Sequence, residues 1–187
     1  MKKIFDFFWE LIKITIIALI IVFPIRYFIF QPFLVWGESM EPSFETGDYL
    51  IVDEISYRFR EPKRGEVIVF NNPYNPSQRF IKRIIGLPGE KVKLKEGKII
   101  ISNKKGEFVL DESSYLPVSI KTTPKMFDEI TLRENEYFVL GDNREVSVDS
   151  RNFGPLPRKN IIGRVIIRAW PFNKLSIFEN GLDLWED

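Results

Sequence analysis

The sequence predicts a mainly β fold, with an antiparallel β-sheet domain preceded by one N-terminal transmembrane α-helix. Its 187 residues include 17 Phe, six Tyr and four Trp, and aromatic side chains suit the half-buried surface of a strand. Short apolar runs alternate with turn residues, and one longer apolar segment precedes them. The length suits one domain with a short extra segment, and 44% hydrophobic residues are enough to form a core.

The long apolar segment covers residues 11–35. Between Ile14 and Val35 the only charged residue is Arg26, and a helix over most of this run is roughly 25 Å long, which is nearly the thickness of a bilayer core. Pro32 is expected to end the helix. We therefore predict a retained transmembrane helix over 11–35.

Three other interpretations of this segment stay open. A cleavable signal peptide needs small residues after its apolar run, whereas the bulky stretch 27–33 follows here. A buried core helix is compatible with the shortness of the strictly uncharged run, 14–25. A helix that lies on the membrane surface needs a persistent polar face, and this segment has none.

The charges around the segment predict its orientation. They are Lys2, Lys3 and Lys13 before the uncharged run and Glu38, Glu41, Glu45 and Asp48 after it. The positive-inside rule then places the N-terminus in the cytoplasm. The predicted organisation is a cytoplasmic N-terminus over 1–10, a plasma-membrane span over 11–35 and a β-rich domain on the outer face over 36–187, so that the lipid bilayer is a partner.

Six runs bounded by Gly, Pro, Asn or Asp are expected to form strands: 48–56, 66–72, 79–86, 91–102, 136–141 and 161–170. The run 91–102 is expected to be a hairpin that turns at Glu96 and Gly97. Residues 103–134 are the most polar and least periodic, so we expect them to leave the sheet. Residues 91–135 together would form a small accessory hairpin and loop.

Composition excludes several kinds of function. A net charge of +1 provides no basic field for nucleic acid, and no nucleic-acid-binding motif is present. The chain has no Cys and no His, so thiolate catalysis and a Ser-His-Asp triad are excluded. No metal or other cofactor is expected, because the carboxylates are scattered. A hydroxyl or carboxylate nucleophile with a Lys or carboxylate base remains possible.

The stretch "GESMEPSF" places Ser39 in a turn just after the apolar segment. Exposed loops often present nucleophilic hydroxyl groups, so Ser39 is a candidate nucleophile. The alternative is an ordinary turn serine that bonds nearby backbone.

In "RFIKRIIGLPGE" the alternation of a strand places Phe80, Lys82 and Ile84 on one face. A lysine among apolar neighbours loses hydration of its charged form, so its pKa falls and its neutral amine can act as a base. The alternative is an edge-strand lysine that reaches solvent.

The stretch "GDNREVSVDSRNFGP", residues 141–155, forms a dense polar loop after a predicted strand. It contains Asp142, Ser147, Asp149 and Arg151, which are candidates for supporting a site. The alternative is a solvated turn with a local pair between Asp149 and Arg151.

Together, these stretches and "GDYLIVDE" resemble, in the same order, the motifs of bacterial type I signal peptidases, which are membrane-bound Ser/Lys proteases that remove signal peptides from exported preproteins. The resemblance covers most of 37–91 and 136–171. It implies the antiparallel β fold of the signal peptidase and self-cleaving-repressor type. It also implies an acyl-enzyme mechanism and cleavage after small residues at the first and third positions before the bond.

The resemblance also implies roles for single residues. Ser39 would be the nucleophile and, through its backbone N–H, an oxyanion donor, and Lys82 would be the general base. Ser147 would orient the lysine, while Asp142 and the pair of Asp149 with Arg151 would support the site. Some members carry Ser at the position of Gly37 as a second oxyanion donor, so a substitute is expected here.

The substrate pockets are expected near Ser39, and the candidates for their lining are Met40, Phe80 and Ile84. Two rival functions stay open: another membrane Ser/Lys protease, of the pilin-transfer type, and a catalytically inactive membrane-anchored homologue.

Overall fold

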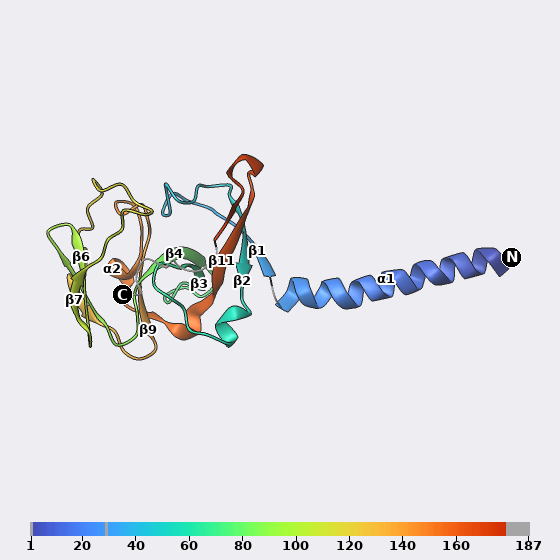
Figure 1. The fold of residues 1–187 in the computed structure, drawn as a ribbon, viewed down its shortest axis with the longest axis horizontal. Helices are drawn as coiled ribbons and strands as arrows, with labels where there is room; N and C mark the ends of the chain where they lie inside the picture. The colour runs from blue at the N-terminus through green and yellow to red at the C-terminus, as the bar shows by residue number, and fades with distance from the viewer. Residues whose placement is uncertain (1, 29, 179–187) are drawn as a thin grey trace.

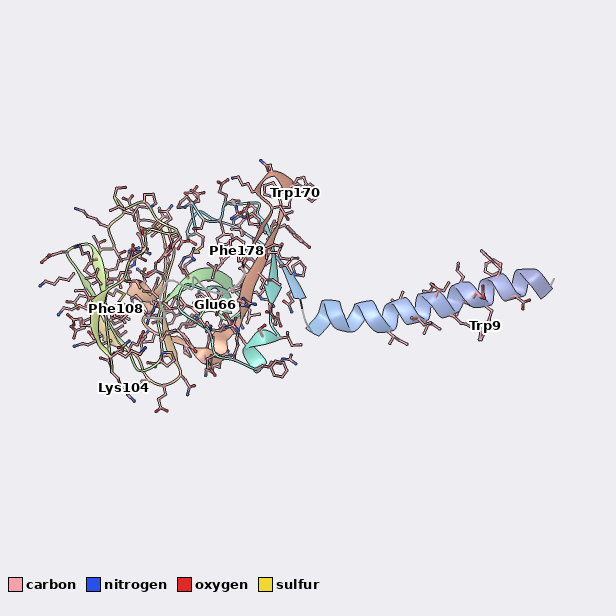
Figure 2. All side chains as sticks on the ribbon, viewed as in Figure 1. Trp9, Glu66, Lys104, Phe108, Trp170 and Phe178 are labelled. Carbon is pink, nitrogen blue, oxygen red and sulfur yellow. The ribbon has the colours of Figure 1, made fainter. Side chains whose placement is uncertain are left out.

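The computed structural model describes residues 2–28 and 30–178, with side chains over 6–20 and 31–178. It contains two antiparallel β-sheets and one long helix that projects away from them (Figure 1). The helix, α1, runs over Lys2–Phe28. Its side chains over 6–20 are all exposed (Figure 2).

The larger sheet has eight strands in the order β1-β2-β11-β3-β4-β9-β10, with β12 paired to β11. Their bounds are β1 Phe30–Leu34, β2 Tyr49–Asp53, β3 Val67–Asn71, β4 Arg79–Gly86, β9 Glu136–Leu140, β10 Leu156–Pro157, β11 Ile161–Trp170 and β12 Ser176–Ile177. The central strand β4 pairs with β3 on one side and β9 on the other. Its backbone is therefore fixed from both sides.

The smaller sheet has four strands in the order β7-β6-β5-β8. They are β5 Lys91–Lys95, β6 Lys98–Asn103, β7 Gly106–Val109 and β8 Glu129–Thr131. Short helices complete the fold: α2 Ser150–Phe153, and the 3₁₀ turns η1 Ser56–Arg58, η2 Arg158–Asn160 and η3 Phe172–Lys174.

Three apolar clusters hold these elements together. One packs residues of β2, β3 and β11 against Met40 and Phe44 of the loop between β1 and β2. A second lies on the other face of β3 and β4 and includes Ile68 and Ile84. The third joins β4 and β9 to the smaller sheet, so the two sheets share a core.

All six predicted strand runs are confirmed. The hairpin at 91–102 is confirmed as well, because β5 pairs with β6, and Glu96 and Gly97 between them have φ of 54° and 80°. Positive φ at both residues is typical of the type I′ turn, whose twist matches that of the strands.

The prediction that residues 103–134 leave the sheet is only partly confirmed. It provides β7 and β8, which pair with β6 and β5 at the two edges of the smaller sheet. The linking segment between them, residues 110–128, leaves the sheet as expected.

The predicted helix bounds of 11–35 are also corrected, because α1 begins at Lys2 and ends at Phe28. Residues Phe30–Leu34 form β1, which pairs with β2 along its whole length. Pro32, which has no N–H to donate, fits this strand because β1 lies at the edge of the sheet.

No helix within the described residues meets the combined demands on length and apolar character for a membrane crossing.

Candidate active site

Ser39 lies in the loop between β1 and β2. Two backbone hydrogen bonds close the base of this loop, from Val35 N to Asp48 O and from Gly47 N to Val35 O. Met40 is fully buried in the first core cluster, whereas Ser39 is only half-buried. Because the neighbouring apolar side chain points into the core, the serine is held at the surface.

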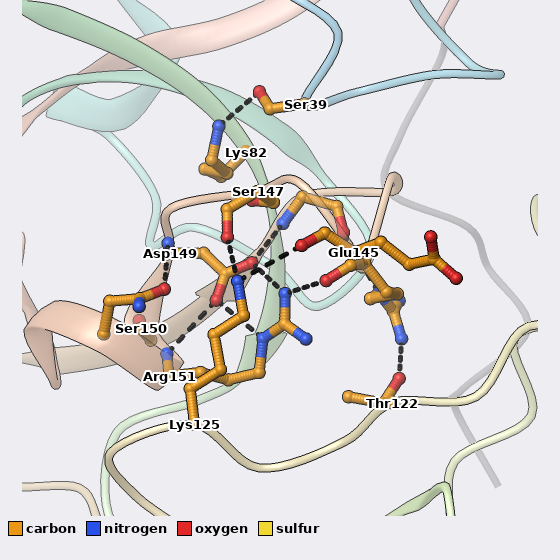
Figure 3. Close-up of polar contacts among 12 residues, drawn as sticks. Ser39, Lys82, Thr122, Lys125, Glu145, Ser147, Asp149, Ser150 and Arg151 are labelled. Atoms are coloured by element: carbon orange, nitrogen blue, oxygen red, sulfur yellow. Dashed lines mark hydrogen bonds and ion pairs between the residues drawn. The ribbon is translucent and has the colours of Figure 1, made fainter.

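Lys82 lies on β4 directly beneath the serine. Its Nζ donates to Ser39 Oγ at 2.6 Å (Figure 3). It donates a second hydrogen bond to Ile81 O at 2.7 Å. Only 3% of the residue is exposed. The alternative of a solvated edge-strand lysine is therefore wrong, because β4 is an interior strand.

The surroundings of Lys82 favour its neutral form. Fully buried Ile68 is its partner across the ladder with β3. By contrast, the Phe80 ring, whose centre lies 5.4 Å from Nζ, favours the charged form through a cation–π contact. Burial lowers the pKa of Lys82 to about 8, against the opposing attraction of Asp149 and Asp142. About a tenth of the amine is therefore neutral at pH 7.

Asp142 is fully buried and pairs with Arg83, the residue after the lysine. Arg83 Nε donates to Asp142 Oδ1 at 2.9 Å, and its Nη2 donates to Oδ2 at 2.6 Å. Arg83 Nη1 also donates to Gly65 O at 3.0 Å. This bidentate pair fixes the loop after β9 against β4.

Asp149 and Arg151 form a second bidentate pair, and both residues have no exposed surface. Arg151 Nε and Nη2 donate to the two carboxylate oxygens at 2.9 and 2.8 Å, while Gly141 N donates to Asp149 Oδ2 at 3.1 Å (Figure 3). Burial would raise the pKa of Asp149, but these bonds and the charge of Arg151 hold it below its usual value. The alternative of a solvated surface pair is therefore wrong.

Ser147 is fully buried beside Gly141. Its hydroxyl lies near enough to Asp149 to help lower the pKa of that carboxyl, yet within the described residues its Oγ has no hydrogen bond of good geometry. The structure thus contains no hydrogen bond from Ser147 Oγ to Lys82 Nζ among the residues it describes. The role of Ser147 in orienting the lysine stays a prediction.

Gly37 is not free to act as an oxyanion donor. Its N–H donates to Thr46 Oγ1 at 3.0 Å. By contrast, no acceptor for the N–H of Ser39 exists among the residues described here. The Ser39 amide can therefore donate to a ligand, and the second donor must come from elsewhere.

The three residues predicted to line the substrate pockets are placed differently from one another. Met40 and Ile84 have no exposed surface, because each packs into a core cluster. Phe80 is partly exposed and lies next to Lys82. Of the three, only Phe80 can contact a substrate directly in this structure.

Sequence reasoning missed the contribution of the linking segment 110–128 to the site. Lys125 Nζ donates to Ser147 O at 2.8 Å (Figure 3), and Met126 N donates to Arg151 O at 2.9 Å. Glu112 pairs with Arg144 of the polar loop. These residues come from a stretch without periodicity or a motif, so no sequence signal pointed to them.

No cluster of three or more carboxylates that could hold a metal is found in the described part of the chain. The site thus consists of a hydroxyl, an amine and compensated ion pairs. A serine that contacts a buried lysine on an antiparallel sheet defines a candidate serine hydrolase site in which lysine occupies the place of the usual histidine.

Comparison with known proteins agrees with this class. Residues 8–170 match the family model described as "Signal peptidase, peptidase S26". The chain is 39% identical over 174 residues to a signal peptidase I from Leptolyngbya laminosa, covering 89% of this chain and 82% of that protein. It is 37% identical over 180 residues to a probable signal peptidase I-2 from Synechocystis, covering 93% and 78%.

A signal peptidase IB from Staphylococcus aureus is 34% identical over 177 residues, covering 86% of this chain and 88% of that protein. A solved structure of a signal peptidase I from Enterococcus faecalis V583 aligns with a TM-score of 0.46 and 32% identity, covering 56% of this chain and 97% of that one. The chain therefore belongs to the signal peptidase family, peptidase S26, and is a hydrolase of the signal peptidase I type.

Substitution of Gly141 tests how closely the polar loop approaches the nucleophile. An added Cβ at Gly141 would overlap with Ser39 O and Ser147 Oγ, so Gly141→Ala should displace the serine. Because a displacement of about 1 Å can lower a rate roughly 100-fold, we expect a loss of that order in kcat. Peptide cleavage measured beside Lys104→Ala, which changes an exposed side chain in the turn between β6 and β7, checks this. Equal rates for the two variants would show that the contact has no importance.

Proposed function

We propose that this protein is a membrane-anchored serine endopeptidase that removes signal peptides from exported preproteins, with Ser39 as nucleophile and Lys82 as general base. The observation that carries the proposal is the distance of 2.6 Å between Lys82 Nζ and Ser39 Oγ, at a lysine that is 3% exposed. The named relatives are signal peptidases, which supports the choice of substrate.

Acylation begins when neutral Lys82 accepts the proton of the Ser39 hydroxyl. Oγ then attacks the carbonyl carbon of the last signal-peptide residue, and the negative charge on the carbonyl oxygen is stabilised by the Ser39 N–H. As the C–N bond breaks, the ammonium group of Lys82 gives its proton to the leaving amine. The products of this step are the free mature chain and an ester between the signal peptide and Ser39.

Deacylation repeats these steps with water. Lys82, neutral again, accepts a proton from a water molecule that attacks the ester carbonyl, and then returns it to Ser39 Oγ as the signal peptide leaves. The burial that lowers the pKa of Lys82 supports this role, because the base must be neutral at the start of both steps.

The ion pairs around the dyad are proposed to support it in two ways. They hold the polar loop in place, and they compensate the charges of Asp142 and Asp149, both of which attract a proton to Lys82. Ser147 is proposed to orient the lysine once the substrate is bound. Cleavage after small side chains at the first and third positions before the bond is proposed because the chain belongs to this family, and the partly exposed Phe80 is the candidate residue for contact with these side chains.

We also propose that α1 anchors the enzyme in the plasma membrane, with the β-sheets on the outer face. The apolar side chains of α1 that the structure describes are exposed, for example Trp9 at 53% and Ile20 at 66% (Figure 2). On the β domain, Trp36 and Phe172 are exposed at 86% and 74%. Exposed aromatics of this kind suit the membrane interface, where a substrate's own apolar segment lies.

Substitution of the dyad tests the proposed chemistry. Ser39→Ala removes the nucleophile and Lys82→Arg keeps a cation that cannot act as a base, so each should lower preprotein cleavage by a factor on the order of 10⁴ or more. The measurement is release of the mature chain from a purified preprotein, with Glu134→Gln, a change at an exposed residue between β8 and β9, as a control. Full activity of Ser39→Ala would point to an inactive homologue or a different nucleophile.

The pH dependence tests the state of the lysine. Since only the neutral amine is active and its pKa is about 8, log(kcat/KM) should rise with unit slope below pH 8 and level off above it. At pH 7 about a tenth of the enzyme is then active. A profile that stays flat from pH 6 to pH 9 would exclude Lys82 as the base.

Fractionation tests the anchor. The full chain, expressed in a bacterial host, should remain with the membrane pellet after a wash at high pH, because the apolar side chains of α1 would be buried in lipid. Protease added to spheroplasts should digest the β domain if it lies on the outer face. Recovery in the wash, or protection of the domain from the protease, would contradict the proposed anchor or its orientation.

A further inference from the structure

The linking segment 110–128 packs against the polar loop that carries Ser147 and Asp149. Besides the bonds from Lys125 and Met126, Arg151 Nη1 donates to Thr123 O at 3.3 Å. Most of these bonds involve backbone atoms. The contacts of Glu112 are different, because they are made by its side chain, which bonds both Arg144 and Tyr115 in one network.

The first branch of this network runs from Glu112 through Arg144. Arg144 Nη1 and Nη2 donate to the two oxygens of the Glu112 carboxylate, the first at 2.8 Å, and Nη1 also contacts Thr122 Oγ1. The exposed fractions of the two side chains are 17% for Glu112 and 2% for Arg144. From the same guanidinium, Nε donates to Gly141 O at 3.0 Å. Glu112 therefore fixes the carbonyl of Gly141 through one arginine.

The second branch runs through Tyr115. Its hydroxyl donates to the Glu112 carboxylate, and burial raises the pKa of Tyr115, so the phenol stays protonated. The Tyr115 ring lies 4.0 Å from the guanidinium carbon of Arg83, and Arg83 holds Asp142. Cation–π contacts of this kind are favourable in desolvated surroundings. The same carboxylate thus supports Asp142, the residue after Gly141.

Both branches end on the backbone segment that contacts the proposed nucleophile. Asn143 N donates to Ser39 O at 3.1 Å, and Gly141 lies so close that an added Cβ would overlap with Ser39 O and Ser147 Oγ. A displacement of residues 141–143 would therefore also displace the backbone of Ser39.

From these contacts we infer that Glu112 is a positioning residue, which holds segment 141–143, and with it Ser39, at its place beside Lys82. This inference rests on the proposed function, since it assigns no chemistry of its own to Glu112. A carboxylate is required at this position because it is the ion-pair partner of the buried Arg144 and the acceptor for the hydroxyl of Tyr115, whose ring lies against Arg83. Removal of one partner leaves a buried charge uncompensated and strongly perturbs the structure around it.

The test uses the full chain in detergent micelles and a signal-peptide substrate. Glu112→Gln should lower kcat by roughly 10- to 100-fold with a change in KM of less than about threefold, because the serine is misplaced while the binding surface is kept. Glu112→Asp, which keeps the charge, should recover part of the lost kcat. The control is Asp111→Asn, since Asp111 is an exposed neighbour whose carboxylate bonds the backbone and side chain of Ser113 and no other group among the described residues; its kcat should equal that of wild type.

Thermal unfolding of each variant separates positioning from loss of fold. If Glu112→Gln does not fold, Tyr115→Phe decides, because it removes one bond to Glu112 and keeps the ring against Arg83. A lowered kcat in the folded variant supports the inference. A kcat equal to that of Asp111→Asn, or a raised KM at unchanged kcat, overturns it.

Measuring wild type and Ser39→Ala in the same assay distinguishes a failure of the proposed function from a failure of the proposed role of Glu112. If wild type cleaves the substrate and Ser39→Ala does not, the proposed function stands whatever the Glu112 variants show. If wild type and Ser39→Ala behave alike, the proposed function itself fails.

Discussion

The burial of one lysine amine against a serine hydroxyl is the interaction on which the rest of this structure depends. An ammonium ion loses hydration when it is buried, so the sheet around Lys82 favours its neutral form. A strand at the sheet edge would leave Nζ in water, where the amine stays charged at neutral pH. The interior position of β4 between β3 and β9 is therefore a chemical requirement as well as a feature of the fold.

The buried carboxylates near the lysine create an opposing demand. Asp142 and Asp149 both attract a proton to Lys82, yet each also receives hydrogen bonds that fix the polar loop. Bidentate arginines resolve this conflict, because Arg83 and Arg151 compensate the carboxylates within the loop itself. The loop can then be rigid and buried without raising the pKa of the lysine back to its ordinary value.

The sequence predicted much of the fold and the centre of the site. Apolar runs between turn residues were enough to locate six strand runs, and alternation placed Lys82 on the same face as Phe80 and Ile84. It did not locate β1, because Phe30–Leu34 continues an apolar stretch and only pairing with β2 separates it from the helix. It also assigned Met40 and Ile84 to substrate pockets, although both are fully buried, since residue type alone does not distinguish a pocket wall from a core.

By itself, the sequence determined that any nucleophile here must work without histidine or cysteine, and it identified Ser39 and Lys82 as the residues to examine. These conclusions depend on composition and local pattern, which are fixed along the chain. Only the tertiary structure decided that Gly37 N–H is already bound by Thr46 and that Glu112 supports the polar loop through Arg144 and Tyr115. Such contacts join residues that are distant in the chain, and their energies depend on burial and geometry that no local pattern specifies.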